Sequence, residues 1–330
     1  MATLLMALVM SAMPVSDAWA GKKTVIKFAT LAPEGSSWMK QMRRLEKEVK
    51  KATNGQVRFK FYPGGVSGDE KDVIRKMRIG QVHAAGFTGV GLGEILPEVR
   101  VLDLPFLLND NKEMNHVYDR MTDHFTAAFE KKGYVLLGWV PVGWIHFFSK
   151  QDVGTLEALR KTKAWMWDGD PLVQAAYKEL GISPHPLSVT DVMMALQTGM
   201  VETVYASPVG TLALQWFTKV NYMSQIRMGH ASGAVLISKR QFKKIPDKYK
   251  GAVKDISKRY LADLVKTINS ENEKAIEVMQ KNGMKLTAAP GQEELDRLHA
   301  IGEKIQKRLT GKLFDQKLLD KVQGHLNEIR

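Results

Sequence analysis

Short β-rich segments alternate with amphipathic helical segments from residue 24 onward, and this alternation restricts the possible folds more than any other feature. Thr24–Thr30, Val57–Phe61 and Val82–Phe87 have the β-branched, aromatic and alternating composition of strands. The two segments between them carry apolar side chains at helical spacing and end at Asn54-Gly55 and at Gly80. This β-α-β-α-β order predicts an α/β fold with a parallel sheet that carries helices on both faces.

The same order begins again near residue 170. Asp170-Pro171 is typical of a helix start, because a capping side chain is followed by proline at the first helical position. Gly181 ends that helix, and strand-like segments follow at Ile182–Leu187 and Met200–Ala206. Ser188–Asp191 fits a capping box for a helix between these strands. Two such units predict two lobes, with a ligand crevice at the carboxyl ends of the strands.

The C-terminal third is predicted to be helical. From Asp247 to about Met279, apolar side chains keep to one helical face, which corresponds to a helix of about 50 Å at 1.5 Å per residue. A helix of that length would cross both lobes. Two helices joined by a break near Asn269–Asn272 are the alternative.

The first 20 residues have the composition of a signal peptide. They are apolar and end in Ala18-Trp19-Ala20, a small-x-small pattern of the kind that signal peptidase cleaves. A buried N-terminal helix is the alternative. No later segment reaches the roughly 18 apolar residues of a membrane span. The sequence therefore predicts a protein that is exported to the periplasm after residues 1–20 are removed.

Several chemistries find no support in the sequence. The chain has no Cys, which excludes disulfides and thiolate metal sites. The formal net charge is +13, but Lys and Arg are scattered without a nucleic-acid motif, so we expect no nucleic-acid partner. No P-loop, nucleophile elbow or paired metal-binding His is present, and Gly89–Gly93 lacks dinucleotide spacing and is expected to be a loop. We expect no enzyme activity, no metal and no cofactor.

The Trp residues are concentrated where the chain would cross between lobes. Trp144, Trp165 and Trp167 fall in short segments with polar neighbours, Gly143-Trp144-Ile145-His146 and Trp165–Asp170. Crossing segments line the crevice of a two-lobed protein, so these Trp residues, with His146 and Asp168, are candidate ligand contacts. Packing in the core is the ordinary alternative for a Trp. An acid or base role for His146 or Asp168 is a weaker alternative, because no nucleophile is paired with them.

Several stretches of the sequence, in the same order along the chain, resemble the DctP-type receptors of TRAP (tripartite) uptake systems. The similar stretches cover nearly the whole chain after the leader: Ala29–Pro33, Phe61–Glu70, Met77–Ala85, Val101–Phe106 and Ala195–Glu202. The resemblance implies a two-lobed periplasmic-binding-protein fold (type II-like) with a long interlobe helix. Lobe I would comprise residues 24–141 and about 232–268, and lobe II residues 142–231 and about 269–330 with the C-terminal helices.

The resemblance breaks at the residues that hold the ligand. Most of the family carries a carboxylate-binding Arg in a Lys-x-Arg segment, and Trp165 stands at that position in this chain. A further family Arg corresponds to Ile145. Indole lacks the donors that pair with a carboxylate. Three alternatives follow: a carboxylate bound by backbone N–H groups near Thr88-Gly89 or by His146, a neutral or aromatic ligand on Trp165, or a cation on the aromatic faces.

We therefore expect an extracytoplasmic receptor for a small organic solute, with aromatic, keto-acid and neutral compounds as candidates. Tyr205 and Ser207, which follow the segment that replaces the family's Val-Asp-Gly run, and Trp38 complete the candidate site. The resemblance implies delivery of the solute to a small and a large membrane subunit, and we expect the protein to be a monomer. An exported ligand sensor of the same fold that serves a signalling partner is the alternative.

Overall fold

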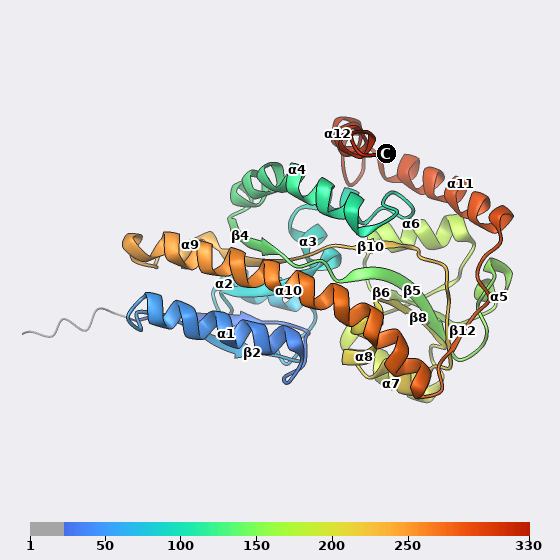
Figure 1. The fold of residues 1–330 in the computed structure, drawn as a ribbon, viewed down its shortest axis with the longest axis horizontal. Helices are drawn as coiled ribbons and strands as arrows, with labels where there is room; N and C mark the ends of the chain where they lie inside the picture. Colours follow the sequence, from blue (N-terminus) through green and yellow to red (C-terminus); the bar gives the residue numbers. More distant parts are fainter. Residues whose placement is uncertain (1–22) are drawn as a thin grey trace, which may run out of the picture.

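A computed structural model describes residues 23–330 and contains two β-sheets flanked by helices (Figure 1). The expected signal peptide, residues 1–20, lies outside the described residues. Within residues 23–330, no helix is both long enough and apolar enough to span a membrane.

The first sheet contains five strands: Thr24–Ala29 (β1), Val57–Tyr62 (β2), Ala84–Thr88 (β3), Tyr134–Trp139 (β4) and Gly233–Ser238 (β11). Their order is β2-β1-β3-β11-β4. β1 is parallel to β2 and β3, as the β-α-β-α-β pattern predicted. The complete sheet is mixed, because β11 is antiparallel to both β3 and β4. This strand comes from residues after the second α/β unit, so the chain crosses back into the first sheet.

The second sheet contains seven strands: Gly143–Ser149 (β5), Ala164–Trp167 (β6), Pro184–Leu187 (β7), Thr203–Ala206 (β8), Tyr222–Met223 (β9), Gly229–Ala231 (β10) and Lys285–Leu286 (β12). Their order is β12-β9-β5-β8-β6-β7, and β10 pairs with β5. β6 is parallel to β7 and β8, and β5 is antiparallel to β8. Two sheets with a crossing strand each way confirm the two-lobed α/β class.

The first unit contains the helices Ser37–Ala52 (α1), Glu70–Ile79 (α2), Gly89–Ile95 (α3), the 3₁₀ helix Pro97–Asp103 (η1) and Asn111–Lys131 (α4), which lie between its strands. The second unit contains Leu156–Arg160 (α5), Pro171–Leu180 (α6), the 3₁₀ helix Val189–Asp191 (η2), Val192–Thr198 (α7), Pro208–Ala213 (α8) and the 3₁₀ helix Trp216–Lys219 (η3). The C-terminal part contains Lys239–Phe242 (α9), Asp247–Lys281 (α10), Gln292–Leu309 (α11) and Gln316–Asn327 (α12).

Several helix ends follow directly from local sequence. Asp170 caps α6 by accepting a hydrogen bond from the backbone N–H of Leu172, with Pro171 at the first helical position. Gly80 and Gly181 end α2 and α6 in the left-handed conformation that glycine adopts without strain. The capping box expected at Ser188 does not form, and α7 begins only at Val192.

The Gly89–Gly93 segment, expected to be a loop, instead forms helix α3. Thr88 caps this helix by accepting from the backbone N–H of Val90. The glycines permit close packing, because a Cβ on Gly89 would lie 2.0 Å from Asp103 Oδ2 and one on Gly91 would lie 2.5 Å from Glu70 Oε2. The missing side chains of Gly89 and Gly91 therefore allow the carboxyl groups of Asp103 and Glu70 to pack against the helix. The spacing of glycines along the sequence does not reveal this role.

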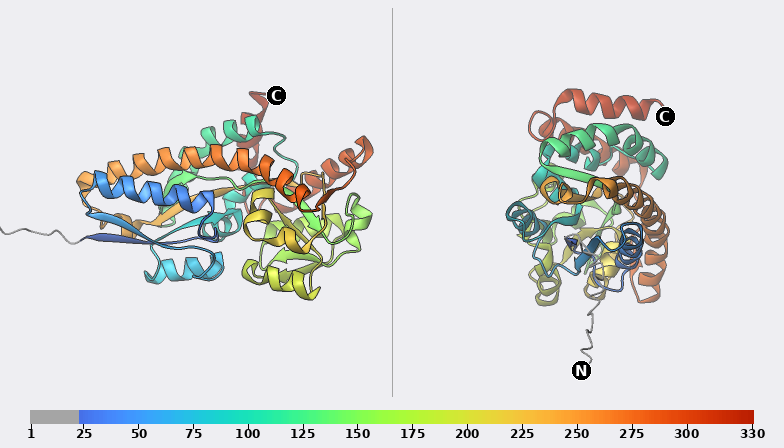
Figure 2. Two further views of the ribbon diagram at one scale, coloured as in Figure 1. Left: turned by 60° about the horizontal axis from the view of Figure 1, so that its bottom comes forward. Right: turned by 90° about the vertical axis from the view of Figure 1, so that its left-hand side faces the viewer.

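Helix α10 is continuous over 35 residues and runs across both sheets (Figure 2). It contacts α1 and β4 on one side of the molecule and α8 and β5 on the other. The proposed break near Asn269–Asn272 is absent. Instead, the Asn272 side chain donates to the Val142 carbonyl (3.2 Å) and accepts from the Val209 backbone N–H (3.0 Å), which attaches the helix to a crossing segment.

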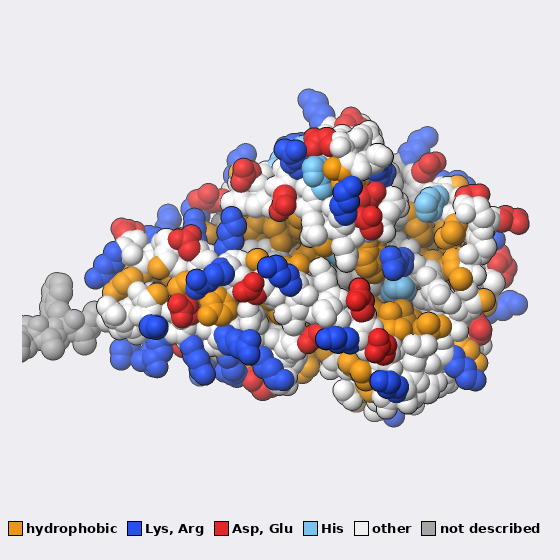
Figure 3. All heavy atoms as spheres, in the orientation of Figure 1, with side chains coloured by type: hydrophobic (Ala, Val, Ile, Leu, Met, Phe, Trp, Pro, Cys, Tyr) orange, Lys and Arg blue, Asp and Glu red, His pale blue; other side chains and the backbone are white. Residues whose placement is uncertain are grey.

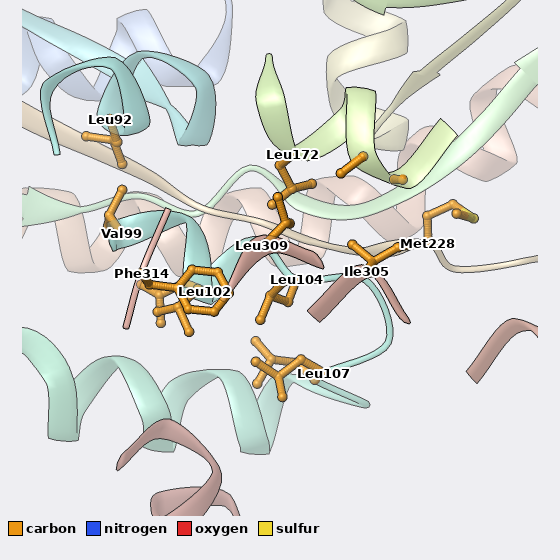
Figure 4. Close-up of a cluster of buried hydrophobic side chains, with 14 of the residues drawn as sticks. Leu92, Val99, Leu102, Leu104, Leu107, Leu172, Met228, Ile305, Leu309 and Phe314 are labelled. Carbon is orange, nitrogen blue, oxygen red and sulfur yellow. The ribbon is translucent and has the colours of Figure 1, made fainter. Parts of the chain in front are cut away.

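Buried side chains from α3, η1, α6 and α11 pack together beside the crossing strands (Figure 4). Leu102 of η1 and Leu104, which directly follows η1, contribute to this cluster with Leu172 of α6 and Leu309 of α11. Helix α11 contacts α6, whereas α12 contacts α4 and η1. The packing fixes η1, a segment that carries charged side chains into the space between the two sheets.

Candidate ligand-binding cavity

A cavity of about 320 Å³ lies between the two sheets. It is lined by the carboxyl ends of β3, β6 and β8, by η1 and α6, and by the crossing residues Val140 and Val142. Most of the lining side chains are apolar or aromatic. Both the size and the lining are typical of small-molecule sites.

Four aromatic side chains form one wall of the cavity, which we call the aromatic wall: Trp165, Trp167, Tyr205 and Trp216. The Trp165 ring stacks on Tyr205 with 4.8 Å between ring centroids, and Trp216 meets Trp165 edge-on at 5.4 Å. Trp165 Nε1 donates to the Leu187 carbonyl (3.0 Å), which fixes the orientation of the indole. The wall is therefore rigid, because each ring is held by a neighbouring ring or a hydrogen bond.

Three charged side chains meet at the cavity and form what we call the ion triad: Arg100, Asp103 and Asp170. Arg100 Nε lies 2.9 Å from Asp103 Oδ2, and Arg100 Nη2 lies 3.1 Å from Asp170 Oδ2. All three are buried, and burial raises the pKa of Asp103 while the Arg100 guanidinium opposes that rise. Since Arg100 belongs to η1 and Asp170 caps α6, the triad joins the two halves of the molecule.

Glu70 and Thr88 interact on the side of the first sheet. The Glu70 carboxyl group accepts hydrogen bonds from the Thr88 backbone N–H (2.7 Å), the Thr88 hydroxyl (2.9 Å) and the Gly91 backbone N–H (2.7 Å). Burial nevertheless raises the pKa of Glu70 to about 7. The Gly89 backbone N–H donates to the Ser232 carbonyl (3.0 Å). The donors expected near Thr88-Gly89 are therefore already occupied by protein groups.

His230 of β10 is buried next to the cavity, and its ring packs against Trp144 with 5.1 Å between ring centroids. It is 2% exposed, and burial lowers its pKa to about 4, so the imidazole is neutral at neutral pH. Within residues 23–330, neither ring nitrogen has a hydrogen-bond partner. His230 is paired with Trp144 across β10 and β5, so its ring lies on the face of the sheet that points away from the cavity.

A second polar contact joins the lobes at the cavity edge. The Asp69 carboxylate, at the start of α2, accepts from Trp167 Nε1 (3.0 Å), from the Ser188 hydroxyl (2.6 Å) and from the Val189 backbone N–H (3.2 Å). Lys71 Nζ donates to the Asp168 carbonyl at 2.8 Å nearby. These contacts hold residues of the second sheet against α2, so the structure is in a closed arrangement.

Of the ten residues predicted to contact a ligand, seven line the cavity: Trp38, Thr88, Gly89, Trp165, Trp167, Tyr205 and Ser207. Thr88 and Gly89 are engaged by Glu70 and Ser232, and the Ser207 hydroxyl caps α8 by accepting from the Gly210 backbone N–H (3.1 Å). Their contacts with a ligand stay predictions.

Three of the predicted residues lie away from the cavity. Ile145 and Phe147 line it, and side chains alternate along a strand, so Trp144 and His146 of β5 point to the opposite side. Trp144 Nε1 donates to Asn111 Oδ1 (2.9 Å), and His146 Nδ1 lies 2.9 Å from the Ser224 carbonyl. Asp168 is exposed in the turn after β6 and contacts Lys71.

The sequence reasoning missed the ion triad. Asp170 was recognised only as a helix cap, and Asp103 only within a family stretch. Arg100 lies in Pro97–Asp103, where isolated charges alternate with apolar residues and no helix or strand was expected. A useful signal was the charge itself, because an Arg within a segment as apolar as Val99–Leu104 requires a buried partner.

Lys and Arg side chains are scattered over the face shown in Figure 3, with Asp and Glu among them, and are densest over α1 and β2. Among the described residues, no group of three or more His, Asp or Glu side chains is arranged to hold a metal ion.

Two α/β lobes joined by crossing strands, with a cavity between them, define a solute-binding protein. Residues 28–309 match the family model described as bacterial extracellular solute-binding protein, family 7 (DctP), and the chain belongs to this family of TRAP-type extracytoplasmic receptors.

The similar proteins cover most of the chain. An uncharacterised protein of Haemophilus influenzae is 25% identical over 309 residues, which are 90% of each chain. A TRAP periplasmic solute-binding protein from Desulfovibrio salexigens with bound orotic acid has a TM-score of 0.86 at 18% identity and covers 93% of this chain and 100% of its own. A Bordetella pertussis receptor that binds pyroglutamic acid has a TM-score of 0.84 at 20% identity, over 92% and 99% of the two chains.

Proposed function

We propose that this protein captures a small organic solute in the cavity between its lobes and delivers it to the small and large membrane subunits of a TRAP-type uptake system. The observation that carries the proposal is the cavity, which both sheets line and which the aromatic wall bounds. The lobes would be residues 24–141 with about 232–268, and residues 142–231 with about 269–330. The proposal includes a periplasmic location after removal of residues 1–20, a monomeric state and no catalytic activity.

The contacts across the cavity edge support capture by closure. Asp69 and Arg100 belong to one half of the molecule, and their partners Trp167, Ser188 and Asp170 belong to the other. Opening the lobes would separate these partners and expose the cavity. Closure on a solute would restore them, so the solute and the interlobe contacts stabilise the same arrangement.

We propose that the solute packs against aromatic side chains. The cavity-lining residues that we propose as contacts are Trp38, Thr88, Gly89, Trp165, Trp167, Tyr205 and Ser207. From the sequence resemblance, we infer that Trp165 occupies the position of the carboxylate-binding Arg of most family members. The two similar structures hold carboxylic acids, orotic acid and pyroglutamic acid. Because Trp165 replaces the Arg that would bind such a carboxylate, we expect the ligand of this protein to differ from them in chemistry.

A thermal-shift screen of the protein without its first 20 residues tests the receptor function. The library should contain carboxylates, amines, neutral diols and aromatic compounds. A ligand at a hundredfold excess over its Kd stabilises the folded state by about 2.7 kcal/mol, and hits are confirmed by calorimetric titration. Uptake of a confirmed solute by cells that express both membrane subunits should depend on this protein. If no compound of the library binds, the receptor proposal is contradicted.

A further inference from the structure

The charges on the cavity wall show what kind of solute the cavity fits. Among the described residues that line the cavity, four side chains carry a carboxyl group and one carries a guanidinium: Glu70, Asp103, Asp170, Glu271 and Arg100. Glu70 has a pKa of about 7 and is only partly ionised at neutral pH. Even without it, carboxylates outnumber the single cation, so the wall has an excess of negative charge.

Arg100 does not supply a free anchor for a carboxylate. Arg100 is 5% exposed, and its guanidinium already lies between two carboxylates, at 2.9 Å from Asp103 and 3.1 Å from Asp170. A bound carboxylate would be a third anion beside one cation in a site with little water. Like charges at such distances repel strongly when they are poorly solvated.

The backbone donors on the first-sheet side are also unavailable. The N–H groups of Thr88 and Gly91 bind Glu70, and the N–H of Gly89 binds the Ser232 carbonyl. His146, the other proposed carboxylate partner, lies off the cavity wall. Both routes by which this cavity was expected to hold a carboxylate without the family Arg are therefore closed.

The remaining cavity-lining groups favour a positive charge. Tyr205 connects the aromatic wall to the ion triad, because it stacks on Trp165 and lies near Asp170. Burial raises the pKa of the Tyr205 phenol, and the charge of Asp170 adds to that rise. Aromatic faces attract cations, most strongly in sites with little water.

We propose that the cavity binds a small organic cation, an amine or a quaternary ammonium on an apolar body, with its charge beside Asp103 and Asp170 and its body against the aromatic wall. This inference rests on the proposed receptor function. It predicts that the ligand of this protein carries a positive charge, unlike the carboxylic acids bound by the two similar structures.

Sets of probes that share one skeleton and differ in charge test the inference. At pH 7.5, calorimetric titration compares benzylamine with benzyl alcohol and benzoate, and cyclohexylamine with cyclohexanol and cyclohexanecarboxylate. Choline and tetramethylammonium test the quaternary form. We expect a cation to bind at least about tenfold more tightly than its neutral and anionic counterparts, which is about 1.4 kcal/mol. Tighter or equal binding of the carboxylate, or no binding by any cation, overturns the inference.

The Asp170→Asn variant tests the same point through the protein. Asn retains an oxygen that can cap α6 while it removes one negative charge. Cation affinity should fall by about tenfold or more, and affinity for the neutral probe should change by less than about twofold. Asp263→Asn, at an exposed position of α10, changes the net charge equally and should alter neither affinity. An unchanged cation affinity in Asp170→Asn overturns the inference.

Asp103→Asn provides a second variant if Asp170→Asn does not fold, as judged by its melting curve. The results also separate the two proposals. If only anionic or neutral solutes bind, the ligand class is wrong and the receptor function stands. If neither these probes nor the broad library binds, both are contradicted.

Discussion

The aromatic wall and the ion triad line the same cavity but are built by different physical means. Trp165, Tyr205 and Trp216 hold one another by ring contacts that tolerate small shifts. The triad depends on Arg100 compensating two buried carboxylates across the lobes. Removal of one ring loses packing contacts in the aromatic wall, whereas removal of the Arg100 guanidinium leaves two buried carboxylates without a compensating positive charge. We therefore expect the triad to dominate stability and to set ligand charge, and the wall to determine ligand shape.

Arg100→Met should produce the largest loss of stability. Because the methionine side chain leaves Asp103 and Asp170 buried without a cation, we expect the free energy of unfolding to fall by about 3–5 kcal/mol. Urea denaturation measures the change.

Two further variants show whether the loss comes from charge. Adding Asp103→Asn and Asp170→Asn to Arg100→Met should recover much of it, because no uncompensated charge remains. Arg43→Met breaks an exposed pair with Glu34 and should have little effect. Equal losses in Arg100→Met and Arg43→Met would contradict the contrast between triad and surface.

His230 should make the protein less stable as the pH falls. Its pKa is about 4 in the folded protein, against 6.5 as the ordinary value, because burial disfavours the charged ring. Between pH 6.5 and 4 the unfolded chain binds the proton more readily, so stability falls with decreasing pH by at most about 3 kcal/mol. Above pH 6.5 this contribution is fully present.

Comparison with His230→Gln isolates this contribution. His146 has a similarly lowered pKa and acts in the same direction, whereas the raised pKa of Glu70 acts in the opposite one. The difference in unfolding free energy between wild type and variant should therefore change across pH 4–6.5 and stay constant above it. A constant difference at all pH values would show that His230 does not titrate as a buried residue.

Gly89→Ala should disturb the triad without any change of charge. The new Cβ would lie 2.0 Å from Asp103 Oδ2 and 2.9 Å from Ser232 Oγ, so Asp103 must move. Overpacking of this kind costs about 1–3 kcal/mol. Gly251→Ala in α10 has no atom within 4 Å of the added Cβ and should instead stabilise the helix by about 0.5–1 kcal/mol. Thermal denaturation should show a lower melting temperature for Gly89→Ala and a higher one for Gly251→Ala than for the wild type.

The contrast between wall and triad also explains what the sequence could predict. Strand and helix periodicity located most elements, and Asp170-Pro171 and Gly181 marked α6 correctly, because caps and glycines act through neighbouring residues. The clustered Trp residues of β6 pointed to the aromatic wall. The resemblance placed residues of about 232–268 in lobe I, but no strand was predicted at β11, since its pairing with β3 joins residues about 150 positions apart, as in Ala234 with Phe87.

The polar half of the cavity could not be predicted for the same reason. Arg100 and Asp170 are 70 residues apart, and only the packing of η1 against α6 brings them together. Trp144 and His146 were wrongly assigned to the cavity because the prediction used the polar residues around them. It did not consider which side chains of a strand point to which face of the sheet. With Ile145 and Phe147 facing the cavity, their neighbours in β5 must face away. Gly89–Gly93 was misjudged because its glycines serve contacts with distant carboxyl groups.

Trp165→Phe should have the smallest effect on stability and a specific effect on ligand response. Phenylalanine retains an aromatic face toward Tyr205 but loses the hydrogen bond from Nε1 to the Leu187 carbonyl, at a cost of about 1 kcal/mol. Trp139→Phe is a matched control: its Nε1 donates to Thr122 Oγ1 (3.0 Å), and the ring packs against α4 away from the cavity. Solute titrations should show a fluorescence change that is largely lost in Trp165→Phe and kept in Trp139→Phe. If both variants respond like the wild type, Trp165 does not contact the solute, and the aromatic wall would be core packing that borders the cavity without serving recognition.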